Sequence, residues 1–445
     1  MGTLLAGAAM RSITPSLERL KRLGDEGAPG PVFTGVHEDI FVRAIVLSDG
    51  DRRVVLGTVD LIIFPAQQLL CDRLVAEYGI DPMGCIFACT HNHESPFMML
   101  SEGDDESAIK TTLGAPTPEL EAYTLFVHDM MAQAVAEAIA ELEPARMGVN
   151  KGLSYINANR DLPSPLGGIQ ANNFHGPSDH ELILLRFESL EGEPIGMFIS
   201  HATHSNYMIW NLIDGSYARI GADLGGGISR FVEKANRNKF PVLWAIAAAG
   251  DQNPITRSRL RSIDVDDEGC FSIKDSVLPF GQNLVQMQSL VATQGLEVLE
   301  LDRTMTDFTD NFSFAGAETY RVVPSRKSYA ALGILPLCGE RPEPVPNEKP
   351  LRLRFRLAVL NGVAFAGVNG EFYARLGMMV KKFLPCTAVV MVEMAYGHQG
   401  YLPDAETEKV NGFGTMNSFA RSGTDSESAF MGAFRELKGK LGLAG

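Results

Sequence analysis

Two histidines and a carboxylate follow an apolar run in the segment from Cys85 to Pro96, CIFACTHNHESP. The run predicts a buried strand, and a strand that fixes the backbone while the next loop supplies polar side chains is a common way to build a site. Residues two apart in an extended chain point the same way, so His91 and His93 can face one cavity and offer imidazole nitrogens to a metal. An HxH pattern by itself leaves a metal site and an ordinary structural role open.

Other apolar runs along the chain also end in polar side chains that suit catalysis. They are FISHATHSN (198–206), AIAAAGDQNP (245–254) and AFAGVNGEF (364–372), and the segment AYGHQGYLPDAE (395–406) adds Tyr396, His398 and Tyr401. Open α/β sheets build sites from side chains that several strands deliver to one end. Nitrogen and oxygen ligands in this number also suit a catalytic zinc that keeps one position for water. Together the segments favour a metal hydrolase over a binding module.

The strands and helices that must position these segments alternate along the chain. Strands are expected at 4–14, 41–47, 54–64, 181–188, 194–200, 241–249, 351–358, 363–368 and 388–394, and helices at 66–78, from Pro118 to before Pro144, at 227–236 and at 281–298. The predicted fold class is therefore α/β, with mixed β-sheets flanked by helices. Residues 1–445 are expected to form one large domain, with a loop at 152–178, a lid or insertion at 256–280 and a Pro-rich connection at 335–350.

The composition argues against some classes of binding partner. The 445-residue chain carries a formal net charge of −15, which argues against a nucleic-acid partner and against an anionic membrane surface. No apolar run reaches membrane-spanning length, the apolar start lacks a basic n-region, and none of the six cysteines forms a CxxC pair. We expect a cytoplasmic enzyme with reduced thiols and a small-molecule substrate, with no nucleic-acid or membrane partner, and leave a homo-oligomer open.

In order and approximate spacing, these segments resemble the N-terminal domain of the neutral/alkaline ceramidases, a family of zinc-dependent amidohydrolases. The resemblance spans nearly the whole chain, from AGAAMRSITP to FGTMNSF. The family's T-H-T-H-S-G-P corresponds to Thr90–Pro96. The resemblance implies that His91 is a zinc ligand and that His93 contacts the substrate or the developing oxyanion.

The resemblance also implies the rest of the zinc site. The family's H-P-T-S corresponds to His201–His204, which points to His201 as the second ligand, with His204 as the alternative. Its P-G-E-P-F corresponds to Asn369–Phe372 and makes Glu371 the carboxylate ligand, and its G-Y-x-P makes Tyr401 a further ligand. The substrate-contacting Asn-Arg pair of the family corresponds to Asn159 and Arg160.

Several positions depart from the family pattern. The family's nucleophilic serine in G-D-V-S-P is Asn253 here, in Gly250–Pro254, and an amide cannot serve as that nucleophile. Metal-activated water must then attack directly, with Asp251 or the neighbourhood of Glu371 available to take the proton. A substrate-contacting tyrosine is replaced by Phe413. Glu94 replaces a serine, and its extra carboxylate could bind a polar substrate group or a second metal.

The sequence therefore predicts a Zn²⁺-dependent amidohydrolase that cleaves a C–N bond of a small soluble N-acyl compound. Long-chain ceramide is not the expected substrate, because a substrate contact is changed and no sequence corresponds to the family's C-terminal immunoglobulin-like domain. A metal-dependent lactonase or esterase acting on a sugar-acid type substrate shares the same carbonyl chemistry and stays open. The missing serine also leaves open a catalytically inactive binding protein.

Overall fold

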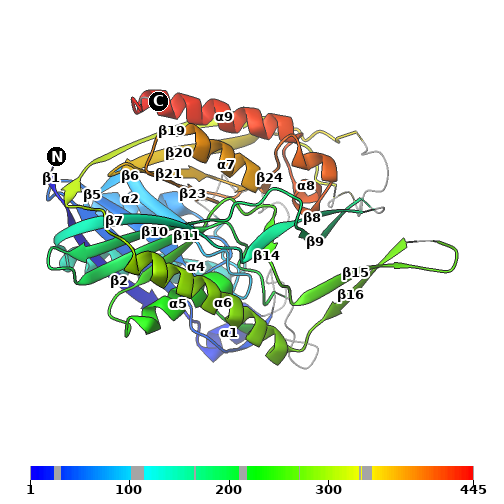
Figure 1. The fold of residues 1–445 in the computed structure, drawn as a ribbon, viewed down its shortest axis with the longest axis horizontal. Helices are drawn as coiled ribbons and strands as arrows, with labels where there is room; N and C mark the ends of the chain where they lie inside the picture. Colours follow the sequence, from blue (N-terminus) through cyan, green and yellow to red (C-terminus); the bar gives the residue numbers. More distant parts are fainter. Residues whose placement is uncertain are drawn as a thin grey trace.

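Two β-sheets that pack against each other form the centre of the fold (Figure 1). The computed structural model describes residues 2–24, 32–101, 115–164, 167–209, 218–269, 271–329, 332 and 343–443. In this part of the chain the larger sheet has nine strands, ordered β13-β11-β10-β7-β2-β4-β5-β6, with β17 paired to β7. Their bounds are β2 Leu5–Ser12, β4 Phe41–Ser48, β5 Arg53–Val59, β6 Ile80–Cys89, β7 Glu143–Leu153, β10 Glu181–Ser189, β11 Pro194–His201, β13 Val242–Ile246 and β17 Phe308–Thr309.

Each face of the smaller sheet contributes residues to a hydrophobic core. Its order is β19-β20-β21-β23, with β19 Phe314–Val323, β20 Leu351–Leu360, β21 Val363–Val368 and β23 Ala388–Val392. Phe365 packs edge-to-face on Phe198 of the larger sheet, with ring centroids 5.7 Å apart, whereas the next residue, Ala366, packs in a second core. Successive residues of a strand point to opposite faces, so one strand serves both cores. The second core lies under α7 Ala374–Phe383 and α9 Gly423–Lys440.

Helices cover the outer faces of both sheets, which gives four layers (Figure 1). In Figure 1, α9 lies above the smaller sheet, and α4 Pro118–Ala140, α5 Asp223–Ala235 and α6 Phe280–Arg303 lie below the larger one. The start of α4 is as expected, because the Thr117 side chain accepts a hydrogen bond from the Leu120 amide and Pro118 occupies the first turn. The shorter helices are α1 Leu17–Leu23, α2 Gln67–Tyr78, the 3-10 helix Thr407–Val410 and α8 Phe413–Asn417.

The strand–helix–strand unit that carries the first histidines is a parallel β5–α2–β6 crossover. Short ladders beside the sheets hold further segments in place. They are β12 Ala218–Ile220 with β3 Phe33–Val36, β22 Glu371–Phe372 with β24 Tyr401–Leu402, and β1 Gly2–Thr3 with β18 Asn311–Phe312. The predicted mixed α/β fold with flanking helices is confirmed.

Two segments differ from the sequence expectation. The region expected to be a loop at 152–178 contains the hairpin of β8 Asn157–Ser164 and β9 Gly167–Asn173, to which β14 Gln252–Pro254 adds a third strand. Its Gly, Pro and Asn content hid the strand pattern. The expected lid at 256–280 contains the hairpin of β15 Arg259–Val265 and β16 Phe271–Val277, which projects from the rest of the fold (Figure 1). The first half of the Pro-rich connection at 335–350, residues 335–342, lies outside the described residues.

The described helices were also compared with the length and apolarity that a membrane crossing requires. None of them meets both requirements.

Candidate metal centre and adjoining pocket

His91 follows the end of β6 and has its ring orientation fixed by a backbone carbonyl. Its Nδ1 lies 2.6 Å from the Ile62 carbonyl oxygen, so Nδ1 carries the proton and donates. In the neutral ring Nε2 then presents a lone pair. The His91 backbone has a φ of 55°, a left-handed conformation that is uncommon outside glycine and that recurs at functional sites.

His204 meets His91 from the loop after β11. Its Nδ1 lies 2.7 Å from the Ala249 carbonyl oxygen, so this ring also presents Nε2 as a lone pair. Burial lowers the pKa of His204 to about 3, which keeps the ring neutral near pH 7. The two Nε2 atoms are 3.0 Å apart, and the Nε2 of His93 lies 3.1 Å from that of His91. Among the described residues these three histidines form a group with ligand atoms within 4.8 Å of one another.

Glu371 adds a carboxylate to the histidines. Its Oε2 lies 3.4 Å from Nε2 of His91 and 3.3 Å from Nε2 of His204, and it has no hydrogen-bond partner. Its Oε1 lies 2.7 Å from Nε2 of His398. Burial by itself would raise the pKa of Glu371, but the surrounding imidazoles hold it well below its ordinary value. The carboxylate is therefore ionised in a site that is almost closed to solvent.

Tyr401 is brought to Glu371 by the backbone. The two residues are opposite each other in the parallel β22–β24 ladder, and the Glu371 amide donates to the Gly400 carbonyl at 3.0 Å. Burial raises the pKa of Tyr401 well above its ordinary value, with Glu371 adding to the effect and Arg160 opposing it. The Arg160 guanidinium also lies over the Tyr401 ring, 5.4 Å from its centroid.

These side chains fit a metal ion. The Nδ1 atoms of His91 and His204 are both bonded to carbonyl oxygens, which leaves the two Nε2 atoms facing each other across 3.0 Å. A carboxylate oxygen of Glu371 without a hydrogen-bond partner faces both of them. Such an arrangement is repulsive unless a cation lies between the donors. Imidazole nitrogen, carboxylate oxygen and phenol oxygen are donors that zinc accepts, and the carbonyls on the two Nδ1 atoms are the usual outer partners of histidine ligands.

His201, which the sequence resemblance pointed to as the second ligand, is not in this group. Its Nε2 lies 3.1 Å from the Ser154 carbonyl oxygen and its Nδ1 lies 2.7 Å from the Thr203 hydroxyl. Nε2 must donate to the carbonyl, and Nδ1 then accepts from the hydroxyl, so neither ring nitrogen has a lone pair left for a metal. The chain turns after β11, and this turn brings His204 to His91 instead.

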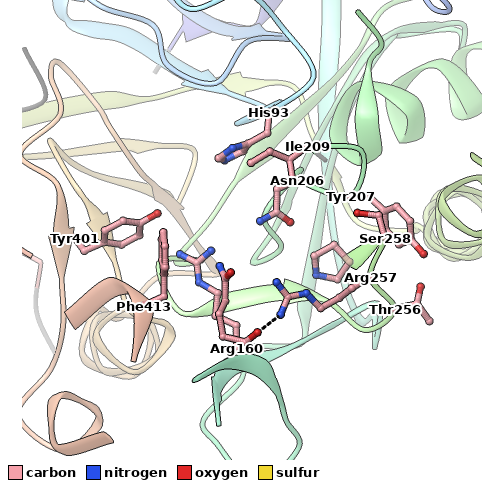
Figure 2. Close-up of a pocket in the computed structure, with 12 residues that line it drawn as sticks. His93, Arg160, Asn206, Tyr207, Ile209, Thr256, Arg257, Ser258, Tyr401 and Phe413 are labelled. Carbon is pink, nitrogen blue, oxygen red and sulfur yellow. Dashed lines mark hydrogen bonds between the residues drawn. The ribbon is translucent and has the colours of Figure 1, made fainter. Parts of the chain in front are cut away.

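A cavity of about 110 Å³ adjoins the candidate metal centre (Figure 2). Figure 2 shows His93 and Tyr401 at its edge, with Arg160 and Phe413 beside them. Burial lowers the pKa of His93 well below its ordinary value, so this ring is neutral as well. Phe413, which stands where the family has a tyrosine, packs edge-to-face on Tyr401 and lies under the Arg160 guanidinium at 5.1 Å. The remaining lining residues are Gln170, Asn206, Tyr207, Ile209, Pro254, Thr256, Arg257 and Ser258.

Arg160 is held by the turn before β14 and by Asn253 in that strand. It donates to the Gly250 carbonyl at 2.6 Å and to Oδ1 of Asn253 at 3.3 Å, and its Nε has no partner. Asn206 also donates to Oδ1 of Asn253, at 3.0 Å. A Cβ at position 250 would lie 2.7 Å from the Glu371 carbonyl oxygen, so this close approach of the turn to β22 requires glycine.

Asp251 and Asn159 lie behind the pocket rather than in its lining. The Asp251 carboxylate accepts hydrogen bonds from the Ala374 amide, from Asn159 and from Gln252. Asn159 also donates to the Pro177 carbonyl. Both residues therefore tie β8, β14 and α7 together around Arg160. The structure does not place Asp251 where it could exchange a proton with a molecule in the cavity.

Glu94 is buried on another side of His93 and does not line the cavity. Its Oε1 lies 2.9 Å from Nε2 of His37, and neither carboxylate oxygen has a hydrogen bond of good geometry. Burial raises the pKa of Glu94 well above its ordinary value, and the nearby Asp223 and Glu38 raise it further. Glu94 also lies outside the three-histidine group, so its geometry supports neither of the roles expected from its position in the sequence.

Sequence reasoning missed some contributors to the site. The sequence places His398 among the polar residues of 395–406 without assigning it a partner, and the structure places its Nε2 2.7 Å from Oε1 of Glu371. Asn206 closes the segment FISHATHSN, whose polar end was the available signal. Arg257 lies in the expected insertion, and nothing in that segment's composition pointed to the cavity.

Comparison with known proteins tests the fold independently. No protein-family model matches the chain. A crystal structure of neutral ceramidase from Pseudomonas aeruginosa matches with a TM-score of 0.71 at 17% sequence identity, covering 99% of this chain and 75% of that one. This chain has the neutral ceramidase fold. A structure described as ceramidase complexed with C2 matches equally well, with a TM-score of 0.72, 16% identity and the same coverage.

Proposed function

We propose that this protein is a zinc-dependent hydrolase that cleaves the amide bond of a small soluble N-acyl compound. The observation that carries the proposal is the meeting of two imidazole lone pairs, on His91 and His204, with the unpartnered Oε2 of Glu371. The ceramidase fold supports an amide as the substrate bond, because two proteins of known structure with this fold are described as ceramidases. The ligands in this proposal are His91, His204, Glu371 and Tyr401.

The pocket residues prepare a carbonyl group for attack. A zinc ion at this centre would polarise an acyl carbonyl and lower the pKa of a bound water. His93 and Arg160 lie at the cavity edge, and the unpartnered Nε of Arg160 is an N–H donor that a carbonyl oxygen can satisfy. The aromatic rings of Tyr401 and Phe413 hold the Arg160 guanidinium in place and exclude water around it.

Asn253 acts as a positioning residue in this proposal. Its amide oxygen accepts from Arg160 and Asn206, and an amide does not attack acyl carbonyls. The attacking group is therefore water, and no covalent acyl-enzyme forms. Asp251 contributes by fixing the pairing of β8 with β14, since its carboxylate is already bonded to three donors.

The test begins with metal content, measured by elemental analysis on untagged protein. We expect about one zinc per chain in the wild type, lost in Glu371→Ala and retained in Glu193→Ala, a matched change at an exposed position. A wild type that takes up no metal, even after zinc is added, contradicts the proposed centre and favours the inactive binding protein. Two metals per chain would return Glu94 and His37 to consideration as ligands.

A substrate panel then separates the hydrolase classes. Matched amides, esters and lactones with the same acyl group share the carbonyl chemistry and differ only in the leaving group. We expect the amide to be cleaved by the wild type and not by Glu371→Ala. Cleavage of lactones or esters with the amide untouched would replace the amidohydrolase by the lactonase or esterase.

A further inference from the structure

Glu393 is a carboxyl group at the end of β23 to which the proposed hydrolysis assigns no role. It directly follows the last residue of that strand, and its side chain is fully buried. Its Oε1 accepts hydrogen bonds from the Ala249 amide at 2.9 Å and from the Gly250 amide at 3.1 Å. One side-chain oxygen therefore binds two consecutive peptide groups in the turn between β13 and β14.

The carbonyl groups of the same two residues hold parts of the candidate site. The Ala249 carbonyl accepts from Nδ1 of His204 at 2.7 Å, and the Gly250 carbonyl accepts from Arg160 at 2.6 Å. The first bond leaves Nε2 of His204 facing His91, and the second orients the guanidinium at the edge of the cavity. The positions of a metal ligand and of the donor for the substrate carbonyl therefore both depend on this turn.

The turn relies on Glu393 for a backbone hydrogen bond. The Gly250 amide also donates to the Phe372 carbonyl, at 3.0 Å, whereas the Ala249 amide donates to Glu393. Removal of the Glu393 acceptor would leave the buried Ala249 amide without this bond. A buried unpaired amide is unfavourable, so the backbone of the turn would shift to find another partner.

Stability alone does not explain a carboxyl group at this position. Its Oε2 is buried and has no hydrogen-bond partner among the described residues. Burial raises the pKa of Glu393 well above its ordinary value, and Glu371 raises it further. Met394 and Tyr396, which follow it, have φ of 53° and 63°, a left-handed conformation that is uncommon outside glycine. Buried polar atoms without partners and strained backbone are unfavourable, and both recur at functional sites.

We infer that Glu393 is a positioning residue of the candidate metal centre, which fixes His204 and Arg160 through the turn at 249–250. The inference rests on the proposed function, which assigns zinc to His204 and the substrate carbonyl to Arg160. Glu393 acts on both through the backbone, as a hydrogen-bond acceptor. The amide oxygen of a glutamine can accept the same two bonds, whereas a methionine of similar length cannot replace them.

Variants at position 393 separate this role from a general loss of stability. Zinc affinity is measured by competition with a chelator, and the geometry of the centre by the visible absorption spectrum of the Co²⁺-substituted protein. We expect Glu393→Met to bind zinc about tenfold to 100-fold more weakly and to alter the cobalt spectrum. Glu393→Gln should keep the wild-type affinity and spectrum. Gln294→Met, a matched loss of a buried side chain that bonds Trp244 and Ser154, should lower the free energy of unfolding and leave both readouts unchanged.

Glu393→Asp replaces the methionine variant if that variant does not fold. It keeps the carboxyl group but is one methylene too short to reach the turn, so the same loss of zinc affinity is expected. A folded Glu393→Met or Glu393→Asp with the wild-type zinc affinity and cobalt spectrum overturns the inference, and so does a Glu393→Gln that is impaired as strongly.

The same measurements separate the inference from the proposed function. Zinc binding that depends on Glu393, in a wild type that cleaves no acyl compound, supports the inference and refutes the proposed hydrolysis. Amide hydrolysis by a protein whose zinc affinity does not depend on Glu393 supports the function and overturns the inference. A wild type that takes up no zinc overturns both.

Discussion

Glu371 and Tyr401 lie opposite each other in a parallel two-strand ladder, with helix α7 and strand β23 between them in the sequence. The ladder presents a carboxylate and a phenol side by side, and the carboxylate lies next to the Nε2 atoms of His91 and His204. The backbone bond from the Glu371 amide to the Gly400 carbonyl fixes the register. The relative position of the two side chains is thus a property of the backbone, and a mutation in one of them should not displace the other.

Replacement of Tyr401 by Phe tests the phenol oxygen alone. The ring would keep its contacts with Phe413 and Arg160, so the fold should be unchanged. We expect Tyr401→Phe to bind zinc about tenfold or more weakly in competition with a chelator, and kcat to fall by about 100-fold. Tyr155→Phe, at an exposed tyrosine, is the matched control. Unchanged zinc affinity would remove Tyr401 from the ligand set.

His201 and His204 provide a direct comparison of two histidines three positions apart. We expect His204→Gln to lose zinc, because one of the facing lone pairs disappears. His201→Gln should keep zinc and activity and lose only about 1 kcal/mol of stability, because its ring makes hydrogen bonds to Ser154 and Thr203. Metal content and the free energy of unfolding, measured on both variants, check this pair. Zinc lost from His201→Gln and kept in His204→Gln would contradict our assignment.

These histidines also show which parts of the site could be predicted from the sequence and which could not. The apolar runs predicted the strands of both sheets, because burial on a pleated surface leaves a readable pattern. The sequence could place polar side chains at the ends of β6 and β11 for the same reason. The resemblance favoured His201 over His204, whereas the structure brings His204 to His91, because the direction of a side chain beyond a strand depends on the turn that follows. The pairing of β22 with β24 could not be predicted from the sequence either, because each strand has only two residues and shows no alternating pattern.

The residues that line the far part of the cavity could not be predicted from the sequence, for a related reason. Arg257 and Gln170 come from segments without apolar periodicity, and only the three-strand sheet of β14, β8 and β9 brings them together. The same sheet places Asn159 behind Arg160 and away from the pocket. The resemblance pointed to Asn159 and Arg160, whereas the direction of each side chain, which decides whether it lines the cavity, is not encoded in a motif.

We expect the buried ring of His128, which lies outside the metal centre, to make the stability of the protein depend on pH. Its ring is buried against Phe64, its Nε2 lies 3.0 Å from the Pro65 carbonyl, and burial lowers its pKa to about 4 from an ordinary 6.5. Between these two pH values the unfolded chain binds a proton that the folded chain does not. The free energy of unfolding therefore falls as pH decreases from 6.5 to 4, by about 3 kcal/mol from this residue.

Urea unfolding at several pH values measures the effect. His128→Gln keeps a donor for the Pro65 carbonyl and does not titrate, so its stability should fall less steeply over the same range. His175→Gln, at an exposed position, should follow the wild type. Identical slopes for His128→Gln and the wild type would mean that His128 does not stay neutral in the folded protein.

A substitution at Asn253 tests whether the substrate is attacked by water or by a side chain. Its amide oxygen holds Arg160 and Asn206 at the cavity, and a serine is too short to reach both. We expect Asn253→Ser to lower kcat/KM by about tenfold to 100-fold, without a burst of product and without an acyl adduct in quenched samples analysed by mass spectrometry. Asn236→Ser, at the end of α5, is the matched control. If the variant gained activity and trapped an acyl group on the new side chain, the pocket would be built for a serine nucleophile. An acyl adduct in the wild type would contradict direct attack by water, because Asn253 could not have formed it and another residue would have to be the nucleophile.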